Sequence, residues 1–175
     1  MQSLIDHALD AANDSLAEAF LDSRRVFWVG NSDDPSAIAA ECSEAARERV
    51  TLADASADAF GTLLALNRTL AGRVEIRLVL YSVGRDALAF VVLPAAEWAQ
   101  LDDDIGDALA QVVWELNDDL DPFGQLQGTD VIDPYHELLA ENPGRYGECL
   151  ARALADPASA GGEPHSDDAD EVMPW

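Results

Sequence analysis

The sequence contains no lysine, so all ten of its basic residues are arginine. Against them stand 34 aspartate and glutamate residues, which give the 175-residue chain a formal net charge of −24 at pH 7. A field of that sign repels the phosphates of nucleic acids and anionic lipid surfaces, and it attracts basic proteins over long distances. We therefore predict that the protein binds no nucleic acid and no membrane, and that a macromolecular partner would be basic.

The sequence also lacks a long hydrophobic run. Crossing a bilayer takes about 20 consecutive apolar residues, and the longest candidate, residues 74–93, is interrupted by Glu75, Arg77, Arg85 and Asp86. The N-terminal stretch MQSLIDHALDAAND has no basic residue that could begin a signal peptide. We therefore expect a cytoplasmic protein.

Cysteine and histidine are scarce. Cys42 and Cys149 lie far apart and in no CxxC or Cys/His spacing, so the sequence predicts neither a zinc site nor a disulfide framework. The chain has three histidines and no GxSxG motif, so it offers no recognisable triad for nucleophilic catalysis. We predict no cofactor and favour a non-enzymatic protein, with carboxylate-based catalysis left open.

Hydrophobic residues make up 49% of the chain, which is enough for a folded core. A length of 175 residues suits one domain better than two. We predict a single α/β domain over residues 1–155. Residues 156–175 are rich in Pro, Gly, Ala and Asp, a composition that predicts a flexible acidic tail.

The clearest structural signal is the segment 73–93, RVEIRLVLYSVGRDALAFVVL. Apolar residues alternate with others on both sides of the polar break SVGRD, which predicts a β-hairpin. One face of the hairpin is apolar throughout, and the other becomes apolar towards the turn. We expect the hairpin to be central in a mixed or antiparallel sheet covered by helices, which places the fold in the α/β (α+β) class.

Periodicity and capping signals predict the elements before the hairpin. Asp33 or Asp34, followed by Pro35, marks a helix start, and Gly72 marks a helix end. A strand–helix–strand succession of these lengths allows a right-handed crossover. In chain order, the predicted elements are a helix at 3–21, a strand at 24–30, a helix at 36–49, a short strand at 50–53 and a helix at 56–70.

After the hairpin, Pro94 starts the longest predicted helix, residues 94–116, with an apolar stripe that includes Trp98 and Leu101. Every charged residue from 97 to 121 is acidic. We predict that a basic partner binds this acidic face and the turn NDDLDPFG, residues 117–124. Trp114 lies beside acidic residues, as an aromatic anchor of an interface would. The predicted partner-binding residues are Asp102, Asp103, Asp104, Asp107, Trp114, Asp118, Asp119 and Asp121.

An alternative site lies in the segment DPYHE. Asp133, His136 and Glu137 could place carboxylate and imidazole ligands on one helical face, which would suit a metal- or carboxylate-dependent enzyme or ligand-binding domain. The HExxH pattern of zinc proteases is not met, because no second histidine follows. A further alternative is a housekeeping domain whose acidity is shared by all the proteins of its cell.

The segment EIRLVLYSVGRDALAFVVLPAAEWAQL, with a hairpin, a Leu-Pro step and a Trp-containing helix, resembles a family of small acidic bacterial α/β proteins. The resemblance covers about residues 56–123. Some of these proteins are similar in size and charge to the immunity proteins of bacterial toxin systems. The resemblance implies a non-enzymatic immunity or inhibitor protein that captures a basic, toxin-like partner.

Overall fold

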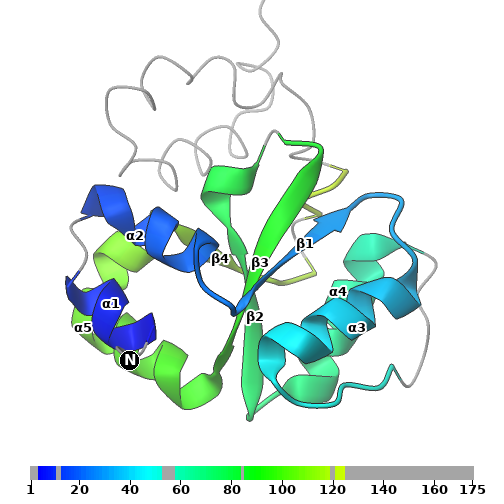
Figure 1. The fold of residues 1–175 in the computed structure, drawn as a ribbon, viewed down its shortest axis with the longest axis horizontal. Helices are drawn as coiled ribbons and strands as arrows, with labels where there is room; N and C mark the ends of the chain where they lie inside the picture. The colour runs from blue at the N-terminus through cyan, green and yellow to red at the C-terminus, as the bar shows by residue number, and fades with distance from the viewer. Residues whose placement is uncertain (1–3, 11–12, 53–57, 84, 119–120, 125–175) are drawn as a thin grey trace, which may run out of the picture.

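The computed structural model describes residues 4–10, 13–52, 58–83, 85–118 and 121–124. Figure 1 shows three layers, in which a sheet lies between α1, α2 and α5 on one side and α3 and α4 on the other. The helices are α1 (Leu4–Asp10), α2 (Asn13–Leu21), α3 (Pro35–Ala46), α4 (Ala59–Leu70), the 3-10 turn η1 (Leu80–Ser82) and α5 (Ala95–Leu109). The strands are β1 (Val26–Gly30), β2 (Val74–Val79), β3 (Ala87–Pro94) and β4 (Val113–Glu115).

The predicted hairpin is confirmed. β2 and β3 pair antiparallel, with Val74 opposite Pro94 and Leu78 opposite Phe90. They occupy the middle of a four-stranded sheet with the order β1-β3-β2-β4. In this order, β1 and β4 form the edges of the sheet that the described residues make. All three strand pairings are antiparallel. The expected α/β fold, with a central hairpin covered by helices, is therefore confirmed.

The alternation within the hairpin divides its side chains between two hydrophobic cores. Ile76 and Phe90 pack in the core shared with α3 and α4. Val79, Val91 and Leu93 pack in the core shared with α1, α2 and α5. All five side chains are fully buried, and burying a side chain of this kind contributes about 1.5–3 kcal/mol relative to leaving it exposed. Both faces of the sheet are thus covered, as the pattern predicts.

The predicted helix start after β1 is confirmed. Asp34 is the N-cap of α3: its Oδ1 accepts a hydrogen bond from the Ser36 N–H at 2.8 Å, and Pro35 is the first helical residue. Asp33 has a separate role, because its Oδ2 accepts the Gly30 N–H at 2.7 Å and closes the end of β1. The two neighbouring carboxylates therefore serve two different elements.

Helix α4 ends at Leu70, as the sequence predicts, but it begins at Ala59 rather than at residue 56. Asp58 is its N-cap, and the Oδ1 of Asp58 accepts the Gly61 N–H at 2.6 Å. Beyond its C-terminus, Gly72 has φ 79°, a left-handed conformation that side chains disfavour. The glycine thus ends the helix and turns the chain into β2.

The predicted helix at 94–116 is wrong after Leu109. α5 ends at Leu109, and Val113–Glu115 form β4, which pairs antiparallel with β2. Helical geometry is already interrupted at Ile105, which has φ −138° and ψ 26°. The Leu80 N–H then donates to the Val112 oxygen at 2.9 Å. Valine and tryptophan suit a strand better than a helix once the edge of β2 is there to pair with.

The predicted strand at 50–53 and the right-handed crossover are also wrong. Residues 50–52 have no regular secondary structure. β1 pairs with β3, which runs antiparallel to it, so no parallel crossover exists among the described residues. The predicted helix at 3–21 consists of two helices, α1 and α2, on either side of residues 11–12.

The turn after β4 returns to the core. Phe123 is buried, and its ring centroid lies 6.2 Å from that of Phe90 on β3. In the described part of the chain, no helix has the length and apolar character needed to cross a bilayer. The predicted tail, residues 156–175, lies outside the described residues.

Candidate functional site

Helix α5 is fixed to the sheet by its apolar side. Trp98 and Leu101 are buried, and the Trp98 Nε1 donates a hydrogen bond to the backbone oxygen of Glu75 on β2 at 3.0 Å. The Trp98 ring also lies against Phe20 of α2, with ring centroids 5.8 Å apart. The orientation of α5 is therefore set by packing, and its opposite side faces solvent.

An ion-pair network also joins α5 to the sheet. Arg77, on β2, donates two hydrogen bonds to Asp102, from Nη1 to Oδ1 and from Nη2 to Oδ2, both at 2.8 Å. Its Nε donates to the Glu75 Oε1 at 2.7 Å, and its Nη2 lies 3.3 Å from the Glu115 Oε1 on β4. The guanidinium carbon lies 4.4 Å from the centre of the Trp98 ring, within cation–π range. One arginine thus connects β2, β4 and α5.

The ion-pair network keeps both Arg77 and Asp102 charged. Burial lowers the pKa of Arg77, but the hydrogen bonds to Asp102 and Glu75 and their negative charges outweigh burial, so the pKa lies above its ordinary value. The hydrogen bond from Arg77 lowers the pKa of Asp102, against the smaller opposing effect of burial. One cation faces three carboxylates, so the network as a whole is negatively charged.

The remaining aspartates on the outer side of α5 have no such partner. Asp103, Asp104 and Asp107 are exposed and form no ion pair with another described residue. Together with Asp102 they border a shallow hollow of about 500 Å³, at the point where Ile105 interrupts the helix. Like charges around one hollow repel each other, so a cation bound there would relieve the repulsion.

A second hollow, of about 590 Å³, brings together two predicted partner-binding residues, Asp102 and Trp114. Arg77 and Glu115 also line it. Trp114 lies on β4 opposite Leu78, and its half-buried side chain packs against the core shared with α3 and α4. Trp114 therefore has a structural role in addition to the contact predicted for it.

The predicted residues of the following turn lie in different surroundings. Asp118 pairs with Arg68 at 2.5 Å, but both side chains are mostly exposed, so this pair adds little stability and leaves the carboxylate accessible. The Oδ1 of Asp121 accepts the Phe123 N–H at 2.9 Å and helps to hold the turn. Asp119 lies outside the described residues. A partner contact by any of these residues stays a prediction.

Among the described residues, no group of three or more His, Cys, Asp or Glu side chains is arranged to hold a metal ion. The alternative site at Asp133, His136 and Glu137 lies outside the described residues, so it also stays a prediction.

Reasoning from sequence missed Arg77 as the centre of the network. The available signal was a charged residue between apolar neighbours in the hairpin strand EIRLVL, on the face expected to be covered by a helix. A buried arginine requires a carboxylate partner. The sequence offered many acidic candidates and no means to choose Asp102, which lies 25 residues away.

The resemblance of segment 75–101 to small acidic bacterial proteins stays an expectation from those residues alone. Comparison of the whole chain with protein-family models, curated proteins and solved structures found no match in any of the three.

Proposed function

We propose that this protein is a non-enzymatic binding protein that captures a basic partner protein on the outer side of α5, in the manner of an immunity or inhibitor protein. The observation that carries the proposal is the group of exposed carboxylates at Asp103, Asp104 and Asp107. They have no ion-pair partner among the described residues. They are therefore available to the lysine and arginine side chains of a partner.

The contacts that fix α5 to the sheet favour binding by a preformed surface. Trp98 and the pair of Arg77 with Asp102 hold α5 in one orientation before a partner arrives. A surface that is already ordered loses less conformational entropy on binding. Asp102 acts here mainly as a positioning residue, because both of its carboxylate oxygens accept hydrogen bonds from Arg77.

The net charge of −24 determines how such a partner would be captured. Complementary charge raises the rate of association more than it sets the final affinity, and salt screens the effect. Capture should therefore be fastest at low ionic strength, and neutralising α5 should slow it.

The test is a pull-down from the source organism at low and at moderate salt, followed by identification of the retained proteins. The informative variant is Asp103→Asn with Asp107→Asn, which removes two charges four positions apart on α5. Its matched control is Glu18→Gln with Asp22→Asn, because both residues are exposed, are also four positions apart, and form no ion pair with a described residue. Both variants change the net charge by the same amount.

We expect the wild-type protein and the control variant to retain the same basic protein, and the α5 variant to retain markedly less of it. Retention of no basic protein at low salt would rule out the proposal. Equal retention by the two variants would show that the overall charge, rather than α5, is responsible.

A further inference from the structure

Strand β1 presents backbone groups along the edge that no other strand of the described residues covers. The Val92 N–H of β3 donates to the Arg25 oxygen at 2.9 Å, which fixes which residues of β1 face β3. Hydrogen-bonded and non-hydrogen-bonded pairs alternate along an antiparallel ladder. Val26, Trp28 and Gly30 therefore direct their N–H and C=O groups away from β3.

Three of these outward groups have no partner in the described part of the chain. The Gly30 groups bond to Asp33, and the Val26 N–H bonds to the Ser23 oxygen at 3.4 Å. The Trp28 N–H, the Trp28 C=O and the Val26 C=O remain. Unpaired groups in a row are the template on which an extended segment can add as a further strand.

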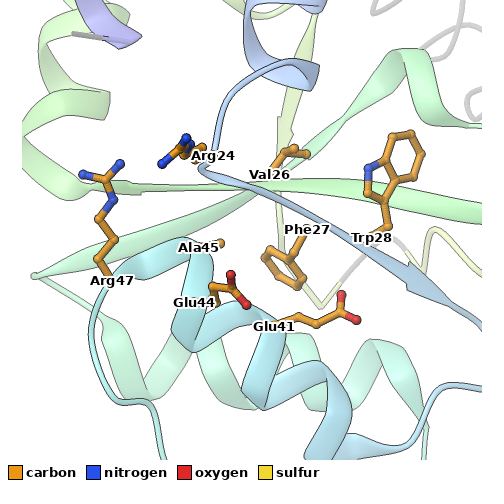
Figure 2. Close-up of a pocket in the computed structure, with 8 residues that line it drawn as sticks. All are labelled: Arg24, Val26, Phe27, Trp28, Glu41, Glu44, Ala45 and Arg47. Carbon is orange, nitrogen blue, oxygen red and sulfur yellow. The ribbon is translucent and has the colours of Figure 1, made fainter. Parts of the chain in front are cut away.

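A groove of about 1030 Å³ runs along this edge, between β1 and α3. Figure 2 shows the guanidinium groups of Arg24 and Arg47 at the end where β1 begins, and the carboxylates of Glu41 and Glu44 pointing from α3 towards β1. None of these four charged side chains forms an ion pair with another described residue. The groove thus offers a basic end and an acidic middle.

We propose that this groove binds an extended segment of a partner protein, which adds to the sheet beside β1 as a fifth strand. Basic side chains of the segment face Glu41 and Glu44, and its C-terminal carboxylate faces Arg24 and Arg47. Because the two arginines lie where β1 begins, the segment runs antiparallel to β1. Its backbone bonds to the outward groups of Trp28 and Val26.

A second copy of this chain fits the groove less well. Two chains that each carry a charge of −24 repel each other. The groups of Gly30 are already bonded to Asp33, so a symmetric pairing centred on Trp28 would lack the outer bonds of the ladder. A basic segment of another protein is instead attracted by the net charge.

The groove is independent of the proposed capture by α5. It lies at the β1 edge and beside α3, whereas α5 covers the other face of the sheet and Arg77 links it to β4 at the opposite edge. Either proposal can therefore fail without the other.

The probe that tests the proposal is the peptide Thr-Arg-Val-Arg-Val, with a fluorescent dye at its N-terminus and a free C-terminal carboxylate. In the antiparallel register the central valine lies opposite Trp28, so both arginines point towards α3. Binding to the full chain is measured by fluorescence anisotropy. NMR then shows whether the backbone amide of Trp28 shifts.

Backbone methylation tests strand addition directly. N-methylation of the central valine blocks a bond to the Trp28 C=O, and we expect affinity to fall about tenfold. The matched control carries the methyl group on the second arginine, whose N–H points away from β1, and should bind almost as well as the parent peptide. Equal binding of the two methylated peptides would overturn the proposal, as would no binding of the parent peptide.

Substitutions in the protein test the charges. Glu41→Gln with Glu44→Gln should weaken binding about fivefold, the effect of losing two exposed ion pairs. Arg24→Gln with Arg47→Gln should abolish the preference for the free carboxylate over a C-terminal amide. Asp103→Asn with Asp107→Asn should leave peptide binding unchanged, which separates this site from α5. A dimer that sedimentation detects, and to which the peptide does not bind, would assign the edge to a second copy and contradict the proposal.

Discussion

Arg77 is a buried cation whose carboxylate partners come from β2, β4 and α5. Replacing Asp102 with asparagine leaves Glu75 and Glu115 near the guanidinium but removes the bidentate pair. We expect Asp102→Asn to lower the free energy of unfolding by about 1.5 kcal/mol, the low end for hydrogen bonds to charged groups. The low end applies because 44% of the Asp102 side chain is exposed.

Urea unfolding at pH 7 measures this difference. Asp103→Asn is the matched control, because Asp103 is adjacent, exposed and without an ion-pair partner among the described residues. The control should change the free energy of unfolding by less than about 0.5 kcal/mol. Equal effects of the two substitutions would show that the bidentate pair adds no stability.

The same pair predicts a dependence on pH. The pKa of Asp102 is lowered in the folded protein, chiefly by the hydrogen bond from Arg77. The stability that ionised Asp102 contributes to the folded protein is therefore fully present above the ordinary carboxyl pKa of about 3.9. This stability is lost as pH falls through the lower pKa of the folded protein. The stability difference between wild type and Asp102→Asn should hold from pH 7 to pH 5 and shrink in stronger acid. A difference that grows on acidification would contradict this assignment.

Cys42 lies in the core between α3 and the sheet. Burial, with a smaller effect of the Glu48 charge, raises the pKa of its thiol to about 12. Because the thiolate is the reactive form, we expect iodoacetamide at pH 8 to leave Cys42 unmodified in the folded protein and to modify it in urea. Peptide mapping by mass spectrometry measures modification of Cys42 separately from modification of Cys149. Rapid modification of the folded protein would contradict the buried position.

Among the single residues, capping groups were predictable and tertiary partners were not. Asp34 and Pro35 act on the turn next to them, so three consecutive residues contain the signal. The pairing of Arg77 with Asp102 depends on how α5 packs across β2, which no local pattern encodes. The exposed edge at Trp28 was missed for the same reason, because strand order decides which strand is last.

At the scale of elements, Gly72 and Gly106 should respond in opposite ways to substitution by alanine. Gly72 has φ 79°, where a side chain costs about 1–2 kcal/mol, so Gly72→Ala should destabilise the protein by that amount. Gly106 is in α5 without a positive φ, and a Cβ there meets nothing within 4 Å. Gly106→Ala should therefore stabilise the protein by about 0.4–1 kcal/mol. Thermal unfolding of both variants checks the signs, and changes of the same sign would contradict the assigned backbone conformations.

The hairpin was predictable because its alternation persists through both strands and is reinforced by burial on both faces. The region after Leu109 was not predictable. Ile105, Leu109 and Val112 have helical spacing, yet Val112 and Val113 are buried because the chain crosses to the edge of β2. Spacing alone cannot distinguish burial by a continuing helix from burial by a turn and a short strand.

At the scale of the whole molecule, the charge of −24 opposes folding through mutual repulsion. Salt screens this repulsion, so the unfolding midpoint should rise between 10 mM and 1 M NaCl, where the screening length falls from about 30 Å to 3 Å. KCl should act in the same way, whereas an uncharged solute at the same osmolarity should not reproduce the steep rise at low concentration. A midpoint that is constant or falls with salt would contradict this account.

The most direct test of the central claim is the association rate between this protein and its basic partner, measured by stopped flow at 20 mM and 150 mM ionic strength. We expect the rate for the wild type to fall steeply with salt. At low salt, Asp103→Asn with Asp107→Asn should associate several-fold more slowly than Glu18→Gln with Asp22→Asn, and dissociation should change less. Equal association rates for these two variants would contradict capture through α5.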